Sequence, residues 1–107
     1  MTTQTCKLAL EDNVATITLV RPHCLDIAGK HELTDTIEQL RENESLRALI
    51  IAGADPQAWL VDVAELVEMA PSDAHSFSEA GHRLAEALEG LPFPTIAAVN
   101  APALGPA

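Results

Sequence analysis

The sequence predicts a single α/β domain. Short apolar runs that alternate with polar residues or are rich in β-branched residues are typical of strands, and longer stretches place apolar residues three or four apart, as in helices. The order strand, helix, strand favours a right-handed crossover between parallel strands. A length of 107 residues is that of one domain. We therefore expect a short sheet with helices packed on it.

The composition is that of a globular protein. Hydrophobic residues make up 48% of the chain, charged residues 21% and aromatic residues only 3%, so the core must be aliphatic. The formal net charge of −10 argues against nucleic-acid binding and against an anionic membrane surface. It is also mildly unfavourable for a phosphate-rich ligand. No nucleic-acid or membrane partner is expected.

Cysteine usage and the N-terminus predict a cytoplasmic setting. Cys6 and Cys24 are the only cysteines and form no CxxC motif, and the opening residues MTTQTCK are polar, unlike a secretory leader. The apolar runs are far shorter than the roughly 20 residues that span a bilayer. A soluble protein with reduced cysteines follows.

The first two strands are expected at 6–10 and 13–20, joined by Glu11-Asp12. In the second strand, Ala15, Ile17 and Leu19 form an apolar face, and the residues between them form a half-polar one. This alternation is typical of a sheet with one buried side. The link suits a hairpin only moderately because it lacks the preferred glycine.

A loop at 23–29 leads to a helix predicted at 30–43. Asp26 is a candidate N-cap residue. Leu33, Ile37 and Leu40 lie on one apolar stripe of the helix. A third strand is predicted at 47–52, ended by Gly53.

Two further helices and a last strand complete the pattern. A helical stretch is predicted at 62–69, preceded by Trp59 as a core or loop anchor. A longer helix is predicted at 72–90, with Ser72 as N-cap and Gly90 just past its end. The β-branched run at 95–99 predicts a buried strand.

The histidines do not suggest a metal site. His75 and His82 are seven residues apart, whereas a helical metal pair usually has a spacing of three or four and a third ligand. We expect both on the surface and no metal site.

Four segments together resemble one known family. Residues 91–107, LPFPTIAAVNAPALGPA, are similar to the signature LPKPVIAAVNGYALGGG of the crotonase (enoyl-CoA hydratase/isomerase) family. The segments NVATITLVRP, LRALIIAG and DVAELVEM precede it in the family's order. The resemblance covers nearly the whole chain but only about two-fifths of a member, on a one-domain length of roughly 250 residues. It implies crotonase-like ββα units, a truncated spiral fold.

The resemblance assigns one loop to coenzyme A. In the family, the loop after the Arg-Pro turn lies against the adenine end of coenzyme A, which makes Leu25, Ile27 and Ala28 candidate contacts. Asp26 stands where the family has asparagine. The alternative is an ordinary strand-to-helix loop. A coenzyme A thioester is the only ligand implied, and no other cofactor is expected.

The resemblance also locates an oxyanion hole, and both halves depart from the family pattern. Val61 occupies the position of one N–H donor, but Leu60 replaces the glycine before it. Pro106 occupies the position of the other donor and has no N–H. Asp62, aligned with the Asp of the family's AGAD segment, is a further candidate ligand contact. Losing one such donor typically costs about 3–4 kcal/mol of transition-state stabilisation.

The acid/base residues of the family are not among these positions. The two catalytic glutamates of its hydratases follow the GGG turn, beyond Ala107. Asp62, Glu65 and Glu68 are possible substitutes, although a solvated helix face explains them more simply. No catalytic residue is assigned with certainty.

Three functions remain open from the sequence. The first is a catalytically impaired or inactive crotonase-like protein that binds acyl-CoA or serves as an assembly module, in a dimer or larger homo-oligomer. The second is an active hydratase or isomerase completed by another chain. The third is a small α/β regulatory domain of the anti-sigma-antagonist type, which would need a phosphorylatable serine that the sequence does not clearly offer.

Overall fold

The computed structural model describes residues 5–22, 24–59 and 67–100, and it has an α/β fold. Two strands are followed by a helix, a third strand, a 3-10 helix, a long helix and a fourth strand. In order, these elements are β1 (Cys6–Glu11), β2 (Val14–Leu19), α1 (Ile27–Arg41), β3 (Ala48–Gly53), η1 (Pro56–Trp59), α3 (Pro71–Glu89) and β4 (Thr95–Ala98).

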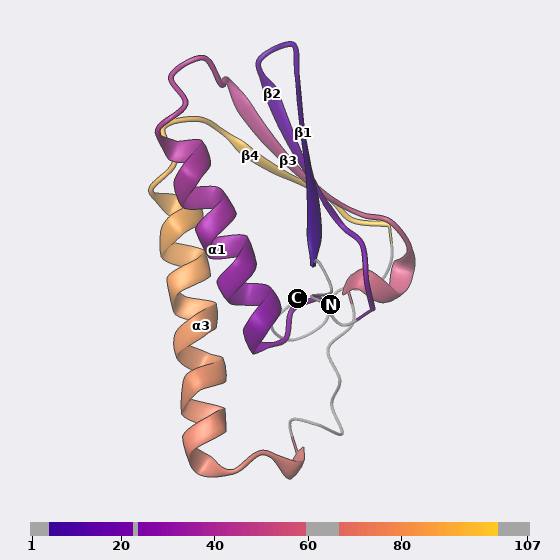
Figure 1. The fold of residues 1–107 in the computed structure, drawn as a ribbon, viewed down its shortest axis with the longest axis vertical. Helices are drawn as coiled ribbons and strands as arrows, with labels where there is room; N and C mark the ends of the chain where they lie inside the picture. Colours follow the sequence, from indigo (N-terminus) through magenta and orange to yellow (C-terminus); the bar gives the residue numbers. More distant parts are fainter. Residues whose placement is uncertain (1–4, 23, 60–66, 101–107) are drawn as a thin grey trace.

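The four strands form one mixed sheet in the order β1-β2-β3-β4. β1 and β2 are antiparallel, whereas β2 with β3 and β3 with β4 are parallel. Helices α1 and α3 lie alongside each other on the same side of the sheet (Figure 1). The expected α/β class, with helices packed on a short sheet and a crossover between β2 and β3, is confirmed.

The core lies between the sheet and the helices. Ala15, Ile17 and Leu19 of β2 are at most 1% exposed, as their alternation predicts. The residues that alternate with them along β2 face away from the helices and are half-buried: Val14, Thr16 and Thr18. The stripe on α1 packs onto the apolar face through Leu33, Ile37 and Leu40.

The hairpin turn falls one residue later than expected. Glu11 pairs with Val14, so Asp12 and Asn13 form the turn, rather than Glu11 and Asp12. Their φ angles are 52° and 66°. A two-residue hairpin favours this left-handed backbone, and aspartate and asparagine tolerate it better than most side chains, so no glycine is required.

Helix α1 begins at Ile27, three residues before the predicted start. The Asp26 side chain accepts a hydrogen bond from the Gly29 N–H at 2.7 Å, which confirms Asp26 as the N-cap. The same carboxylate pairs with Arg21 at 3.0 Å. The predicted loop at 23–29 is therefore wrong in its last three residues, because the cap lets the helix start directly after Asp26.

Helix α3 begins at Pro71, and Ala70 rather than Ser72 is its N-cap. Proline is favoured at the first helical position because its missing N–H has no helical partner there. The predicted cap at Ser72 is therefore wrong. Gly90 closes the helix with a right-handed φ of −80°.

Strand β4 is exposed, contrary to the predicted buried strand. All four of its residues are exposed, and Ile96 is 54% accessible. β4 lies at the edge of the sheet and pairs only with β3 among the described strands. β4 is therefore an apolar strand that no other element in the described part of the chain covers.

Most of the helix predicted at 62–69 lies outside the described residues. Among the helices that the structure describes, none has the length and apolar content of a membrane span.

Candidate functional site

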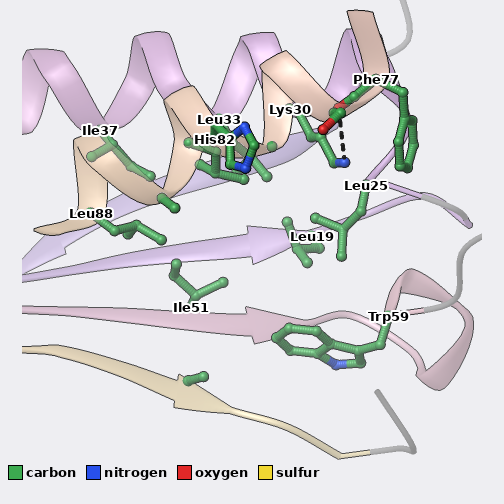
Figure 2. Close-up of a pocket in the computed structure, with 15 residues that line it drawn as sticks. Leu19, Leu25, Lys30, Leu33, Ile37, Ile51, Trp59, Phe77, His82 and Leu88 are labelled. Atoms are coloured by element: carbon green, nitrogen blue, oxygen red, sulfur yellow. Dashed lines mark hydrogen bonds between the residues drawn. The ribbon is translucent and has the colours of Figure 1, made fainter. Parts of the chain in front are cut away.

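A mostly apolar cavity of about 530 Å³ lies between the helix layer and the sheet (Figure 2). It is bounded by the last residue of β2, by η1 after β3, and by the start of α1. These segments meet at the carboxyl ends of the parallel strands, where open α/β sheets bind ligands. Aliphatic side chains from strands and helices make up much of its wall: Leu19, Leu33, Ile37, Ile51, Leu84 and Leu88.

Lys30 is the one charged side chain among the described residues that line this cavity, apart from the ionisable His82. It is only 3% exposed. Its Nζ lies 3.4 Å from the centroid of the Phe77 ring and donates to the Phe77 carbonyl oxygen at 3.5 Å. Figure 2 shows the side chain extending from α1 into the gap beside Leu25.

The surroundings of Lys30 disfavour its charge. Burial lowers the pKa of the Lys30 ammonium from its usual range, and the negative charge of Asp26 opposes this only in part. Asp26 is itself engaged by Arg21. Within the described part of the chain, Lys30 forms no ion pair with a carboxylate.

The sequence alone did not predict Lys30 as a site residue, although its position on the apolar stripe of α1 indicated an unusual lysine. It lies three residues before Leu33 and seven before Ile37, on the apolar stripe of α1. A lysine on such a stripe either extends its charge out to water or is buried with it. Lys30 is buried because α3 packs closely over its side chain at Gly81. A Cβ added at Gly81 would lie only 3.3 Å from the Lys30 Nζ.

Trp59 fixes the end of β4 beside the cavity. Its ring is buried, and its Nε1–H donates to Asn100 Oδ1 at 2.8 Å. A Cβ at Gly53 would lie 2.5 Å from this Nε1, so glycine lets the indole lie against β3. The predicted anchoring role of Trp59 is confirmed.

The two thiols do not form a reactive site. Cys6 and Cys24 are buried and unlinked by a disulfide. Burial is the main cause that raises the pKa of each thiol. Both thiols therefore stay protonated and are poor nucleophiles.

The structure places only some of the predicted ligand contacts. Leu25 is buried and lines the cavity. Ile27 is half-buried and borders a separate hollow with Met69 and Asp73, and Ala28 is exposed. The remaining predicted positions lie outside the described residues and stay predictions: Val61, Asp62 and Pro106.

The predicted surface positions of the two helix histidines are confirmed. His75 and His82 are exposed, and His75 lies 3.7 Å from Glu79. The described ranges contain no group of three or more histidine, cysteine or acidic residues placed to hold a metal ion.

Replacing Lys30 with methionine is expected to stabilise the fold at neutral pH by about 1 kcal/mol, because it removes a buried charge and keeps an unbranched stem. Since burial lowers the pKa of Lys30, the unfolded chain holds this proton to higher pH than the folded chain. The free-energy cost of burying the charged Lys30 is constant at pH values below the pKa of Lys30 in the folded chain. This cost decreases as the pH rises from that pKa toward the pKa of Lys30 in the unfolded chain. The advantage of Lys30→Met should therefore shrink at alkaline pH.

Urea unfolding of both proteins at several pH values measures this difference. Comparing the two proteins at each pH cancels the alkaline effects of Cys6 and Cys24, which both share. A variant less stable than the parent at neutral pH would contradict the inferred charge penalty.

Comparisons with known proteins identify the family. The enoyl-CoA hydratase/isomerase family model matches residues 9–106. A short-chain-enoyl-CoA hydratase of Clostridium acetobutylicum is 31% identical over an alignment 103 residues long, which covers 92% of this chain and 40% of that protein. The chain thus spans about two-fifths of the length of this curated relative.

Solved structures agree on the fold. The enoyl-CoA hydratase of Bacillus anthracis superposes with a TM-score of 0.81 at 26% identity, over 96% of this chain and 42% of that one. DspI of Pseudomonas aeruginosa superposes with a TM-score of 0.84 at 22% identity, over 97% and 41% of the two chains. Because the family model matches this chain over nearly the whole length of the chain, the chain belongs to the enoyl-CoA hydratase/isomerase family.

Proposed function

We propose that this chain binds the acyl part of a coenzyme A thioester in the cavity between the helices and the sheet, and that the chain alone does not hydrate it efficiently. The observation that carries the proposal is the apolar cavity at the carboxyl ends of the strands. Family membership supports a thioester as the ligand, and it leaves the regulatory-domain hypothesis without support.

The cavity has suitable size and lining for an acyl chain. Its volume of about 530 Å³ lies within the range of small-molecule sites, roughly 300–1,000 Å³. Each methylene that leaves water for such a wall contributes about 0.8 kcal/mol. Leu25, which the family resemblance assigns to coenzyme A, forms part of the wall. Ile27 and Ala28 follow at the start of α1, where they are proposed to contact the same ligand.

The expected loss of catalysis rests on the oxyanion hole. By resemblance, Val61 and Pro106 hold the two donor positions, with Asp62 beside the first. Pro106 cannot donate an N–H. Two aligned donors are the main electrostatic support for the charge that develops on a thioester carbonyl. A chain with one donor should bind a thioester better than it converts it.

Filling the cavity tests the binding proposal. Ala97 is exposed on β4 and lines the cavity, so Ala97→Phe should fill it at little cost in folding. Ala98 is the next residue and lies on the opposite face of the strand, so Ala98→Phe is the matched control. We expect octanoyl-CoA affinity to fall at least about tenfold in Ala97→Phe, since several buried methylenes are displaced, and to stay unchanged in Ala98→Phe.

Titration calorimetry of each protein with octanoyl-CoA and with free coenzyme A gives these affinities. Equal affinity in both variants would overturn the proposed site. Crotonyl-CoA hydration by the chain alone should be negligible. Efficient turnover by the chain alone would overturn the proposed impairment, and turnover only with a second protein would favour an active enzyme completed by another chain.

Self-association is proposed as a second property. The exposed strand β4 has unpaired backbone groups on its outer edge among the described strands, and Ile96 and Val99 are about half accessible. Uncovered apolar edge strands favour pairing with another copy. This supports the homo-oligomer expected from the sequence.

A further inference from the structure

We propose that the cavity is a binding site for an aliphatic carboxylate, with the Lys30 ammonium as its counter-ion. The acyl chain would occupy the apolar wall, and the carboxylate would lie at Lys30. This inference goes beyond the binding of a thioester and does not require it, because a thioester has no negative charge at its acyl carbon.

The buried Lys30 ammonium is incompletely coordinated by the described residues. An ammonium offers three donors. In the described structure Lys30 uses one of them, for a bond to the Phe77 carbonyl that is 3.5 Å long, at the outer limit for a hydrogen bond. The Phe77 ring adds a cation–π contact. Neither partner carries a negative charge, although a buried ammonium is costly without one.

In the described part of the cavity wall, no anion competes for the Lys30 ammonium. The described residues that line the cavity include no aspartate or glutamate. The acidic group that acts on Lys30 is Asp26, the N-cap residue of α1, whose carboxylate lies 3.0 Å from the Arg21 guanidinium. On α3, the titratable residue lining the cavity is His82, which can only add positive charge. A ligand carboxylate would therefore meet no competing carboxylate among the described residues of the cavity wall.

The cavity is amphipathic along its length. Lys30 and Phe77 lie near one end in Figure 2, whereas Ile51, Ile37 and Leu88 lie farther along between the helices and strands. A cavity with a positive charge at one end and an apolar wall beyond it is complementary to a carboxylate on an aliphatic chain. Hydrogen bonds between charged groups are stronger than those between neutral groups, and an apolar environment of low dielectric constant strengthens them further.

Two sources could supply this chemistry. One is a free fatty acid. The other is an acyl thioester that carries a second carboxylate at the far end of its chain. Both place the same group against Lys30, and they differ in whether coenzyme A must be attached.

The test uses octanoate, 1-octanol, octanoyl-CoA and the mono-coenzyme A thioester of octanedioic acid. Trp59 is the single tryptophan and lines the cavity, so its fluorescence reports occupancy. We expect Lys30→Met to weaken the binding of octanoate, or of the octanedioyl thioester, about tenfold or more. Binding of 1-octanol should remain, which shows that the cavity is intact.

Lys7→Met is the matched control, because it removes the same charge from an exposed position on β1. It should leave all affinities unchanged. If Lys30→Met weakens the binding of octanoate but not of the octanedioyl thioester, the ligand is assigned as a free fatty acid. If it weakens only the binding of the octanedioyl thioester, the ligand is assigned as an acyl thioester with a second carboxylate. The inference is overturned if neither carboxylate binds, if Lys30→Met leaves both affinities unchanged, or if Lys7→Met weakens them equally.

The test separates this inference from the proposed function. If octanoyl-CoA binds equally to Ala97→Phe and to the parent, the thioester proposal fails. Octanoate binding that depends on Lys30 would then still support the carboxylate site.

Discussion

Replacing Gly29 with alanine is expected to destabilise the chain by about 3 kcal/mol or more, or to prevent folding. A Cβ at this position would lie 1.7 Å from the carbonyl oxygen of Cys24. That oxygen belongs to the backbone, so no side chain can move aside. The start of α1 would have to shift, and the Gly29 N–H would lose its bond to Asp26. Circular dichroism and urea unfolding measure the loss.

Gly81→Ala is the matched control for this prediction. Gly81 lies within α3, where alanine is favoured over glycine by about 1 kcal/mol. Its added Cβ would meet only the flexible end of Lys30, at 3.3 Å. We expect stability equal to or above that of the parent. Similar stability of Gly29→Ala and Gly81→Ala would contradict the tight contact between α1 and the loop before it.

Replacing Ile17 with alanine is expected to cost about 3 kcal/mol of folding free energy. Ile17 is fully buried on β2 in the covered face of the sheet. Its removal leaves a void beneath the helices in a core that is almost wholly aliphatic. For a domain of this size the melting temperature should fall by more than about 10 °C, which calorimetry measures.

Thr18→Ala tests the same strand on its other face. Thr18 is half-buried and faces away from the helices. We expect a change of less than about 1 kcal/mol, mainly from the lower strand propensity of alanine. If both substitutions cost the same, the assignment of a single covered face would be wrong.

The sequence predicted the parts of the fold that local patterns determine. The alternation along β2 identified Ile17 and its neighbours as the buried face, and the stripe on α1 identified Leu33 and Ile37. Asp26 was identifiable as a cap because the start of a helix leaves N–H groups unsatisfied. These features depend on residues a few positions apart.

Features that depend on distant neighbours were not predictable in the same way. The run at 95–99 has the composition of a buried strand, but its exposure depends on what lies beside it in the sheet, which its own residues do not encode. The burial of Lys30 depends on the approach of α3 at Gly81, which is 51 positions away. The resemblance located candidate oxyanion positions, whereas the buried cation emerged only from the packing of two helices.

The exposed strand β4 has a consequence for the conditions under which copies of this chain meet. Each copy carries a net charge of −10, so two copies repel each other over about one Debye length, roughly 8 Å at physiological ionic strength. Added salt shortens that range without weakening the attraction between apolar edges. Encounters through β4 should therefore become more frequent in concentrated salt, the reverse of an assembly held by ion pairs.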